Sequence, residues 1–218
     1  MATYNRAQIL HDRVVQSVLA QTYQNFELII VGDGCTDETA DVIARVNDPR
    51  VRFYNLQERG SYPENPIHRW MVAGVSPANK ANAEAKGQWI AHSDEDEIFE
   101  PNHLELLLRH AQKHDLEFVY SKVLQEQTPG VWQEVGKEPI VRFLQVNNCG
   151  HSTTMWRSYL NLFQYDINTW KQHLPADIHR WDRLFLAKVR MGFLSQITTN
   201  APLRPQTTVF AHQSEDSI

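Results

Sequence analysis

The chain has 218 residues, a net charge of −5 and a pI near 6.0. Its hydrophobic fraction of 42% is sufficient for the core of one domain, whereas the acidic balance disfavours a nucleic-acid partner, which usually meets a basic face. The cysteines Cys35 and Cys149 form no disulfide framework and no metal-binding spacing, so we expect a cytoplasmic protein. No apolar run approaches 18 residues, which leaves peripheral association with the inner face of a membrane as the only membrane contact open.

Helices and strands alternate in the first part of the chain. A polar turn with no strand before it is expected over residues 1–6. Apolar residues at helical spacing then predict a helix over 7–21, and short apolar runs predict strands over 26–31 and 51–54, with a helix over 36–46 between them. Such alternation indicates an α/β sheet with right-handed crossovers.

The rest of the chain continues this pattern after a long irregular stretch at 56–74. The expected helices cover residues 78–86, 101–114, 158–163 and 177–189, and the expected strands cover 89–91, 117–124 and 131–135. Asn147 to Ser152 form a polar loop, and the tail from about residue 196 is expected to be irregular.

Carboxylates follow the strand expected at 89–91. The residues Asp94, Glu95, Asp96 and Glu97 stand side by side, and ionised carboxylates this close together repel one another unless a cation lies among them. Oxygen ligands suit Mg²⁺ or Mn²⁺. The alternative interpretation is a solvated acidic loop that opens the next helix. Asp33 also follows a strand, and α/β sheets bind ligands beyond the carboxyl ends of their strands, which favours a functional site.

Several enzyme classes lack their motifs here. The chain has no Gly-x-Gly-x-x-Gly, no phosphate-binding P-loop and no Gly-x-Ser-x-Gly. His110 and His114 are four residues apart on an expected helix but lack the glutamate between them and a third ligand, so we expect surface residues.

A series of segments, in order, resembles the family-2 glycosyltransferases of the GT-A fold. The segments are residues 2–6, 17–31, Gly32-Asp33-Gly34-Cys35-Thr36-Asp37, Asn79, Ala85-Lys86-Gly87, and residues 90–101 with an Asp-x-Asp motif. The resemblance implies a Rossmann-like, mostly parallel sheet flanked by helices, with a small acceptor-side C-terminal portion. It also implies one domain, with a nucleotide-binding half at about 1–100, an acceptor-binding half at about 101–195 and a tail at 196–218.

The resemblance further implies a metal-dependent, inverting transfer of a sugar from a UDP-linked donor to a saccharide or lipid-linked acceptor. The residues expected to bind the nucleotide sugar are Thr3, Tyr4, Asn5, Arg6, Asp33, Asn79 and Asp94. Asp96, with Asp94, would bind Mn²⁺ or Mg²⁺. Asp177 would be the general base, with Asp182 as the second candidate, although a helix-capping role for Asp177 is open. The acceptor is expected at His151, Ser152 and Trp181.

The chain departs from this family at its start. Family members begin with a central strand just before the turn, whereas only Met1 and Ala2 precede it here. Truncation, a misassigned start and replacement by another segment are all open explanations, because an absent central strand exposes two backbone edges. Asp33 also stands alone where two aspartates are usual. Two alternatives to an active transferase follow: a degenerate module that binds a nucleotide sugar or glycan, and a sugar nucleotidyltransferase.

Overall fold

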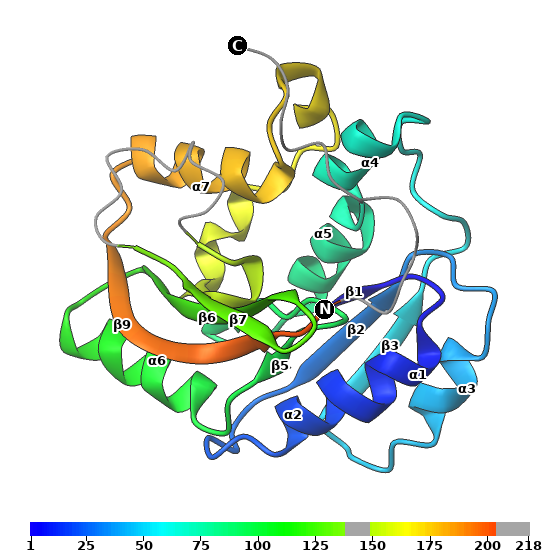
Figure 1. Cartoon of the computed structure of the whole chain (residues 1–218), viewed down its shortest axis with the longest axis horizontal. Helices are drawn as coiled ribbons and strands as arrows, with labels where there is room; N and C mark the ends of the chain where they lie inside the picture. Colours follow the sequence, from blue (N-terminus) through cyan, green and yellow to red (C-terminus); the bar gives the residue numbers. More distant parts are fainter. Residues whose placement is uncertain (138–148, 204–218) are drawn as a thin grey trace.

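The computed structural model describes residues 1–137 and 149–203, and its strands form two sheets with helices on both faces (Figure 1). The first sheet is parallel, with the order β1 (Ala2–Thr3), β2 (Leu28–Gly32), β3 (Val51–Asn55). The second sheet has the order β4 (Trp89–Ala91), β8 (Thr154–Arg157), β6 (Phe118–Thr128), β9 (Met191–Ala201), β5 (Ile98–Phe99), and β7 (Val131–Val135) pairs with β6.

The helices form two layers. The layer drawn below the sheets in Figure 1 contains the continuous helical segment of α1 (Ala7–Ile9), the π-helix η1 (Leu10–Val15) and α2 (Gln16–Leu19), together with α3 (Thr39–Ala44) and α6 (His103–Lys113). The layer drawn above contains α4 (Pro66–Val72), α5 (Val75–Glu84) and α7 (Ala176–Leu186). Three short 3₁₀ helices are η2 (His151–Thr153), η3 (Ser158–Leu162) and η4 (Thr169–Gln172).

The predicted α/β architecture is confirmed, and the sheet is mixed. Parallel pairing joins β1, β2 and β3, and joins β6 to β9, whereas the other pairs of the second sheet are antiparallel. β4 and β5 precede residue 100 but lie in one sheet with β6, β8 and β9. The acidic loop that follows β4 is therefore joined by strand pairing to the expected acceptor half, whereas β1, β2 and β3 form a separate sheet.

Two main apolar cores lie against these sheets. In the first helical segment Leu10, Val14 and Val18 recur at intervals of four residues, so one face is buried against β2 and α6. A second core around Phe118, Trp156 and Trp181 joins β6, β8 and α7. The two cores fix the first and last helices on opposite faces of the sheets.

The expectation of a strandless turn at residues 1–6 is wrong. Ala2 and Thr3 form β1, in register with Val31 and Gly32 of β2. The amino group of Met1 extends the ladder by donating a hydrogen bond to the carbonyl of Ile29 at 3.0 Å. The amides of Val31 and Asp33 donate to the carbonyls of Met1 and Thr3, so β2 pairs with one edge of this short strand.

The stretch at 56–74 contains the helix α4, which the sequence analysis missed. Asn65 caps this helix by accepting hydrogen bonds from the amides of Ile67 and His68, and Pro66 occupies the first turn. An Asn-Pro pair is a common start signal for a helix, because the proline needs no hydrogen-bond partner for its nitrogen there. This start signal is present in the sequence, but the helix is only seven residues long, which is too short to show a clear hydrophobic period.

The expected irregular tail is wrong as far as Ala201. Residues 191–201 form β9, which pairs with both β6 and β5. Thr198 and Thr199 are fully buried, and the Thr198 hydroxyl lies 2.6 Å from that of Ser121. Because these buried residues are polar, the hydrophobic pattern of the sequence does not predict this strand. The tail beyond residue 203 and the loop residues Asn147 and Asn148 lie outside the described residues.

His103, at the start of α6, provides a test of this packing. Its ring stacks on Phe99 with centroids 3.7 Å apart, and Nδ1 lies 2.8 Å from the Thr198 hydroxyl. Burial lowers the pKa of His103 to about 3. The unfolded chain therefore binds a proton near pH 6.5 that the folded chain excludes, so this residue lowers stability progressively as the pH falls below about 6.5.

We expect His103→Gln to reduce the loss of unfolding free energy between pH 6.5 and pH 5 by about 2 kcal/mol. Urea unfolding at the two pH values measures this difference. His114→Gln, at the exposed C-terminal end of the same helix, is the matched control. An unchanged pH dependence in His103→Gln would contradict the prediction.

Candidate active site

A cleft of about 520 Å³ lies where the carboxyl ends of β1, β2 and β4 meet the start of α7. The predicted site residues that line it are Thr3, Tyr4, Arg6, Asp33, Asp94, Asp96, His151 and Asp177. Most of them lie at or just after the ends of β1, β2 and β4, whereas His151 lies in η2, before β8, and Asp177 lies in the first turn of α7. The strand-end rule thus brings together residues that are far apart in the sequence.

Asp33 is held at the end of β2. Its backbone amide donates to the carbonyl of Thr3 at 2.8 Å, and its carboxylate accepts a hydrogen bond from the amide of Gly60 at 3.0 Å. Only 3% of the residue is exposed. One carboxylate oxygen is therefore engaged by the loop after β3, which orients the side chain at the rim of the cleft.

Asp94 is surrounded by polar groups from the segment after β4 and from η2. Its backbone amide donates a hydrogen bond to the hydroxyl of Ser152 at 2.8 Å, and the Ser152 hydroxyl in turn donates to the Asp94 carboxylate at 3.2 Å. The same carboxylate lies 3.1 Å from Nε2 of His92 and 3.7 Å from Nδ1 of His151. Asp94 is therefore held by His151 and Ser152 of η2 as well as by His92, which follows β4.

The imidazoles of His92 and His151 stack on each other with centroids 3.4 Å apart. Burial lowers the pKa of His92 and lowers the pKa of His151 to about 4. Both rings are consequently neutral near pH 7 and retain a lone pair. On the far side, Nε2 of His151 lies 2.7 Å from the hydroxyl of Tyr165.

The acidic loop is tied to the turn after β1. Glu95 accepts a hydrogen bond from the amide of Tyr4 at 2.9 Å and forms an ion pair with Nε of Arg6 at 3.0 Å. Arg6 also approaches Asp96, with Nη1 3.6 Å from Oδ2. Burial raises the pKa of Glu95, and the guanidinium and the amide offset part of that effect. Glu95 thus joins the two segments that were expected to contact the nucleotide.

The donor set in this cleft fits a divalent cation. One ligand atom each from His92, Asp94 and His151 lies within 4.8 Å of the others, and Asp96 lines the same cleft. Carboxylate oxygens suit Mg²⁺ and Mn²⁺, and neutral imidazole suits several transition metals. The acidic stretch is not merely a solvated loop, because Asp96 is 4% exposed.

Asp177 lies in the first turn of α7, on the opposite wall of the cleft. Burial raises the pKa of its carboxyl group, and the proximity of His151 offsets part of this shift. A carboxylate whose pKa moves toward neutrality is better suited to accept a proton. Oδ1 also accepts the amide hydrogen of Ile178 at 2.8 Å.

Other predicted residues are not part of the cleft lining. Asn5 accepts a hydrogen bond from the amide of Thr36 at 2.8 Å and so connects the loops after β1 and β2. Asn79 is bonded through both ends of its amide to the backbone of Tyr165. Ser152, Trp181 and Asp182 are buried and do not line the cleft. Ser152 acts through Asp94, and Trp181 contacts the edge of the His151 ring at 5.8 Å.

The sequence analysis missed His92, Tyr165 and Arg59 in this region. The guanidinium of Arg59 lies 3.7 Å from the ring centroid of Tyr4, and both residues line the cleft. His92 carried a signal, because it lies two positions after the buried Ile90 and so on the same side of the extended chain. For Tyr165 and Arg59, which lie in loops, the sequence offers no comparable signal.

Known proteins resemble this chain in sequence and in fold. The model of the family described as "Glycosyl transferase family 2" matches residues 1–63 and 75–180. The chain belongs to glycosyl transferase family 2. The prediction of the family is therefore confirmed, and with it the assignment to a class of transferases.

Three family members and neighbours illustrate the similarity. The putative colanic acid biosynthesis glycosyl transferase WcaA of Escherichia coli is 34% identical over 116 residues, which cover 52% of this chain and 37% of that protein. TarS 1-349 of S. aureus, solved in complex with UDP, superposes with a TM-score of 0.71 at 20% identity over 94% of this chain and 59% of that one. Mannosyltransferase PcManGT from Pyrobaculum calidifontis, in complex with GDP-Man and Mn²⁺, gives a TM-score of 0.64 at 13% identity over 91% and 54%.

These structural similarities show the GT-A-like fold. The chain spans about a third of the length of WcaA and somewhat more than half of each of the two solved chains. Among the described residues, no helix is both long and apolar enough to cross a membrane.

Proposed function

We propose that this family-2 chain transfers a sugar from a UDP-linked donor to a saccharide or lipid-linked acceptor, with inversion at the anomeric carbon. The observation that carries the proposal is that one cleft combines Asp33 and the acidic loop on one wall with Asp177 on the other. The solved TarS and PcManGT chains, which share the fold, were captured with UDP and with GDP-Man and Mn²⁺, respectively. A nucleotide-sugar donor is thus the ligand class that the fold supports best.

Each wall has a distinct role in the proposed reaction. Thr3, Tyr4 and Asp33 bind the nucleoside, and the guanidinium of Arg59 packs against the Tyr4 ring. Arg6 is close enough to the acidic loop to face the diphosphate. Asn5 and Asn79 lie outside the cleft lining and hold the backbone of Thr36 and Tyr165, respectively.

Asp94 and Asp96 would hold Mn²⁺ or Mg²⁺, with His92 and His151 as neighbouring nitrogen donors. A bound cation supplies charge compensation for the departing diphosphate. Ser152 orients Asp94 by hydrogen bonds to its amide and carboxylate. The protein contribution is therefore a prearranged set of oxygen atoms, which lowers the cost of reorganisation during transfer.

Asp177 would act as the general base. It takes the proton of the acceptor hydroxyl as that oxygen bonds to the anomeric carbon, while the bond from that carbon to the diphosphate oxygen breaks and UDP leaves. The single displacement inverts the anomeric configuration. His151, beside Asp177 in the cleft, would contact the acceptor, and Trp181 supports the His151 ring from the core.

Calorimetric titration of UDP tests the donor site. We expect binding with Mn²⁺ that weakens at least tenfold in EDTA and in Asp96→Ala, because both changes remove charge compensation at the diphosphate. Asp41→Ala, which removes an exposed carboxylate on α3, is the matched control and should bind UDP as the wild type does. Metal-independent binding that is unchanged in Asp96→Ala would contradict the metal assignment. Binding without sugar transfer to any acceptor would favour a binding module.

A further inference from the structure

The helix α4 lies in a segment that the family match leaves out. The match ends at residue 63 and resumes at residue 75, and α4 spans Pro66–Val72 between them. Trp70 and Met71 of this helix line the same cleft as Asp177. The membership of the chain in its family therefore does not account for what α4 contributes to the site.

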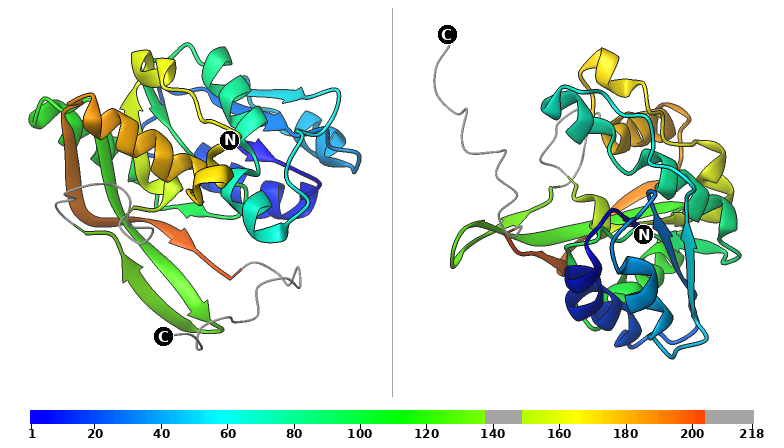
Figure 2. Two further views of the ribbon diagram at one scale, coloured as in Figure 1. Left: turned by 90° about the horizontal axis from the view of Figure 1, so that it is seen from above. Right: turned by 90° about the vertical axis from the view of Figure 1, so that its right-hand side faces the viewer.

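Contacts with two neighbouring segments hold α4 in place. Nε and Nη2 of Arg69 donate hydrogen bonds to the carbonyls of Pro63 and Glu64 at 3.0 and 2.8 Å, which fixes the loop before the helix. On another side, the ring centroid of His68 lies 5.0 Å from that of Trp170 in η4. α4 lies beside η4 in both views of Figure 2, and η4 directly precedes α7 in the chain. The helix is therefore attached to the wall of the cleft that carries the proposed base.

A different face of α4 presents apolar side chains to solvent. Ile67 is 54% exposed and Trp70 is 48% exposed, and residues three positions apart lie on the same face of a helix. Within residues 1–137 and 149–203, no aromatic ring or cation stacks on Trp70. Tryptophan is enriched among the residues that dominate binding energies. Trp70 therefore has the properties of a binding residue at the rim of the cleft.

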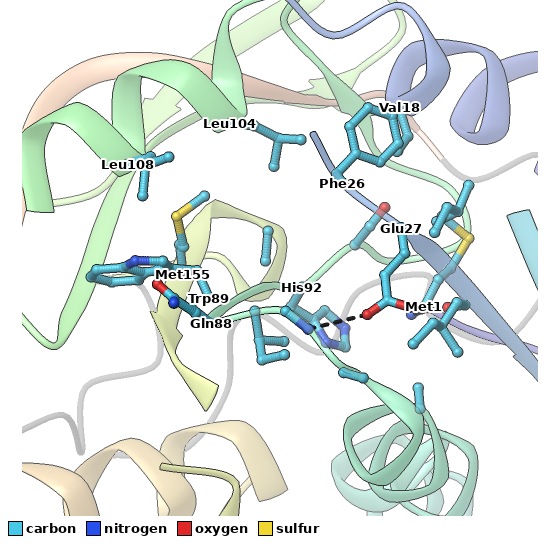
Figure 3. A pocket seen from close by; sticks show the side chains of 18 of the residues that line it. Met1, Val18, Phe26, Glu27, Gln88, Trp89, His92, Leu104, Leu108 and Met155 are labelled. Atoms are coloured by element: carbon cyan, nitrogen blue, oxygen red, sulfur yellow. Dashed lines mark hydrogen bonds between the residues drawn. The ribbon is translucent and has the colours of Figure 1, made fainter. Parts of the chain in front are cut away.

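A second cavity, between β2 and β4, is not reached by α4. It has a volume of about 530 Å³, and Figure 3 shows Val18, Leu104 and Leu108 among the side chains around it. No residue of α4 lines this cavity, whereas Trp70 lines the cleft. The ligand that meets Trp70 is therefore one that occupies the cleft.

A sugar ring has the chemistry that such a surface recognises. One face of a pyranose carries mainly C–H groups, which pack on an aromatic ring, and its edge carries hydroxyl groups that need hydrogen-bond partners. The cleft that Trp70 borders offers polar groups from Arg59, Gln125 and Asp177. A lipid surface fits less well, because the exposed face of α4 offers only Ile67 and one ring and the net charge of −5 disfavours anionic lipids.

We propose that Trp70 is the stacking platform for a sugar ring of the acceptor, and that the acceptor is a saccharide of at least two units. This inference rests on the proposed sugar transfer. The unit with the reacting hydroxyl lies at Asp177, and the next unit packs its C–H face on Trp70. Because η4 lies between α4 and α7 (Figure 1), the platform lies beyond the reacting unit. Trp70 thus selects the acceptor and takes no part in the bond exchange.

Saturation-transfer NMR with unmodified saccharides tests this binding without turnover. The probes are glucose, galactose, mannose and N-acetylglucosamine, each as the monosaccharide, the disaccharide and the trisaccharide, with and without UDP and Mn²⁺. We expect a disaccharide or trisaccharide to bind with the strongest saturation on the C–H protons of one ring face. Trp70→Ala should weaken this binding by on the order of tenfold. Trp70→Phe, which keeps a flat ring, should recover most of the affinity.

A second tryptophan and the UDP affinity are the controls. Trp132→Ala removes an exposed ring on β7 that does not line the cleft, and it should leave saccharide binding unchanged. Trp70→Ala should keep UDP affinity within about twofold of the wild type. A parallel loss of UDP affinity would overturn the proposal, because the ring would then serve the donor. Unchanged saccharide affinity in Trp70→Ala, or no binding of any probe, would overturn it as well.

Transfer assays separate this inference from the proposed function. With a disaccharide acceptor, Trp70→Ala should raise KM by about tenfold and leave kcat within about threefold, because the ring contributes binding that the substrate and the transition state share. Transfer with an unchanged KM would leave the proposed function in place and overturn the platform. Saccharide binding that depends on Trp70, without transfer to any acceptor, would support the saccharide site and overturn the transferase. Binding to phosphatidylcholine vesicles that depends on Trp70, without saccharide binding, would assign the ring to a lipid surface and overturn the proposal.

Discussion

Asp177→Asn is expected to lower sugar transfer by on the order of 10³-fold while UDP affinity stays within about twofold. The asparagine side chain has almost the same shape but cannot take the acceptor proton. The first turn of α7 should tolerate the change, because the amide oxygen of asparagine can still accept the hydrogen bond from Ile178. The measurement is UDP release from UDP-sugars with saccharide acceptors, together with UDP titration.

The pH dependence provides a second readout for the same residue. Burial raises the pKa of Asp177, and only its ionised form can act as a base. Transfer should therefore fall as the pH decreases through this raised pKa, and the fall should begin at a higher pH than for an ordinary aspartate. In Asp177→Asn this acidic limb should disappear from the residual rate.

Asp182→Asn is the matched control on the same helix. Asp182 is buried and does not line the cleft, so its substitution should leave the acidic limb in place. If Asp182→Asn lost transfer and Asp177→Asn did not, the second candidate of the sequence analysis would be the base. If Asp177→Asn lost stability rather than turnover, the helix-capping interpretation would hold.

The sequence predicted the elements whose periodicity is complete within one segment. The helical spacing of Leu10, Val14 and Val18 is visible in the letters alone, as is the apolar run that becomes β2. β8 and β9 were missed because partners distant in the sequence define them. Thr154 and Thr198 are fully buried, yet nothing local distinguishes them from surface threonines.

The same distinction applies to the candidate site. Asp33 and Asp94 were predictable because each follows a strand, and strand ends meet at one edge of the sheet. The stacking of His92 on His151 joins residues 59 positions apart, and it depends on β4 pairing with β8. Tyr165 reaches His151 from the loop after η3, which has no periodic pattern. Contacts of this kind require the register of the second sheet.

That register depends strongly on Trp156, and Trp156→Ala is expected to cost about 3–5 kcal/mol of unfolding free energy. Trp156 is fully buried in β8, opposite Ile90 of β4 and Phe118 of β6. Its indole Nε1–H donates to Asn161 at 2.9 Å, and the guanidinium of Arg180 lies 4.3 Å from its ring centroid. Removing the ring therefore leaves a cavity between two strands and one helix.

Arg180 adds to this cost because its buried guanidinium has few groups around it that compensate for lost hydration. Its Nε donates to the carbonyl of Phe163 at 2.6 Å, whereas its Nη1 has no hydrogen-bond partner. Burial lowers the pKa of this guanidinium, and the faces of Trp156 and Tyr165 offset part of its lost hydration. In Trp156→Ala the charge would lose one of these faces. Trp156→Phe keeps a ring and should cost less, about 1–2 kcal/mol, for the lost hydrogen bond.

Thermal unfolding should show these differences directly. For a chain of this length, we expect the midpoint of Trp156→Ala to fall by about 6 to 20 °C. Trp132→Ala, on β7 with 42% of the residue exposed, is the matched control and should cost less than about 1 kcal/mol. Equal losses in the two alanine variants would mean that β8 does not organise the second sheet. A large loss confined to Trp156→Ala would connect the fold to the site, because the same strand begins directly after His151 and Ser152.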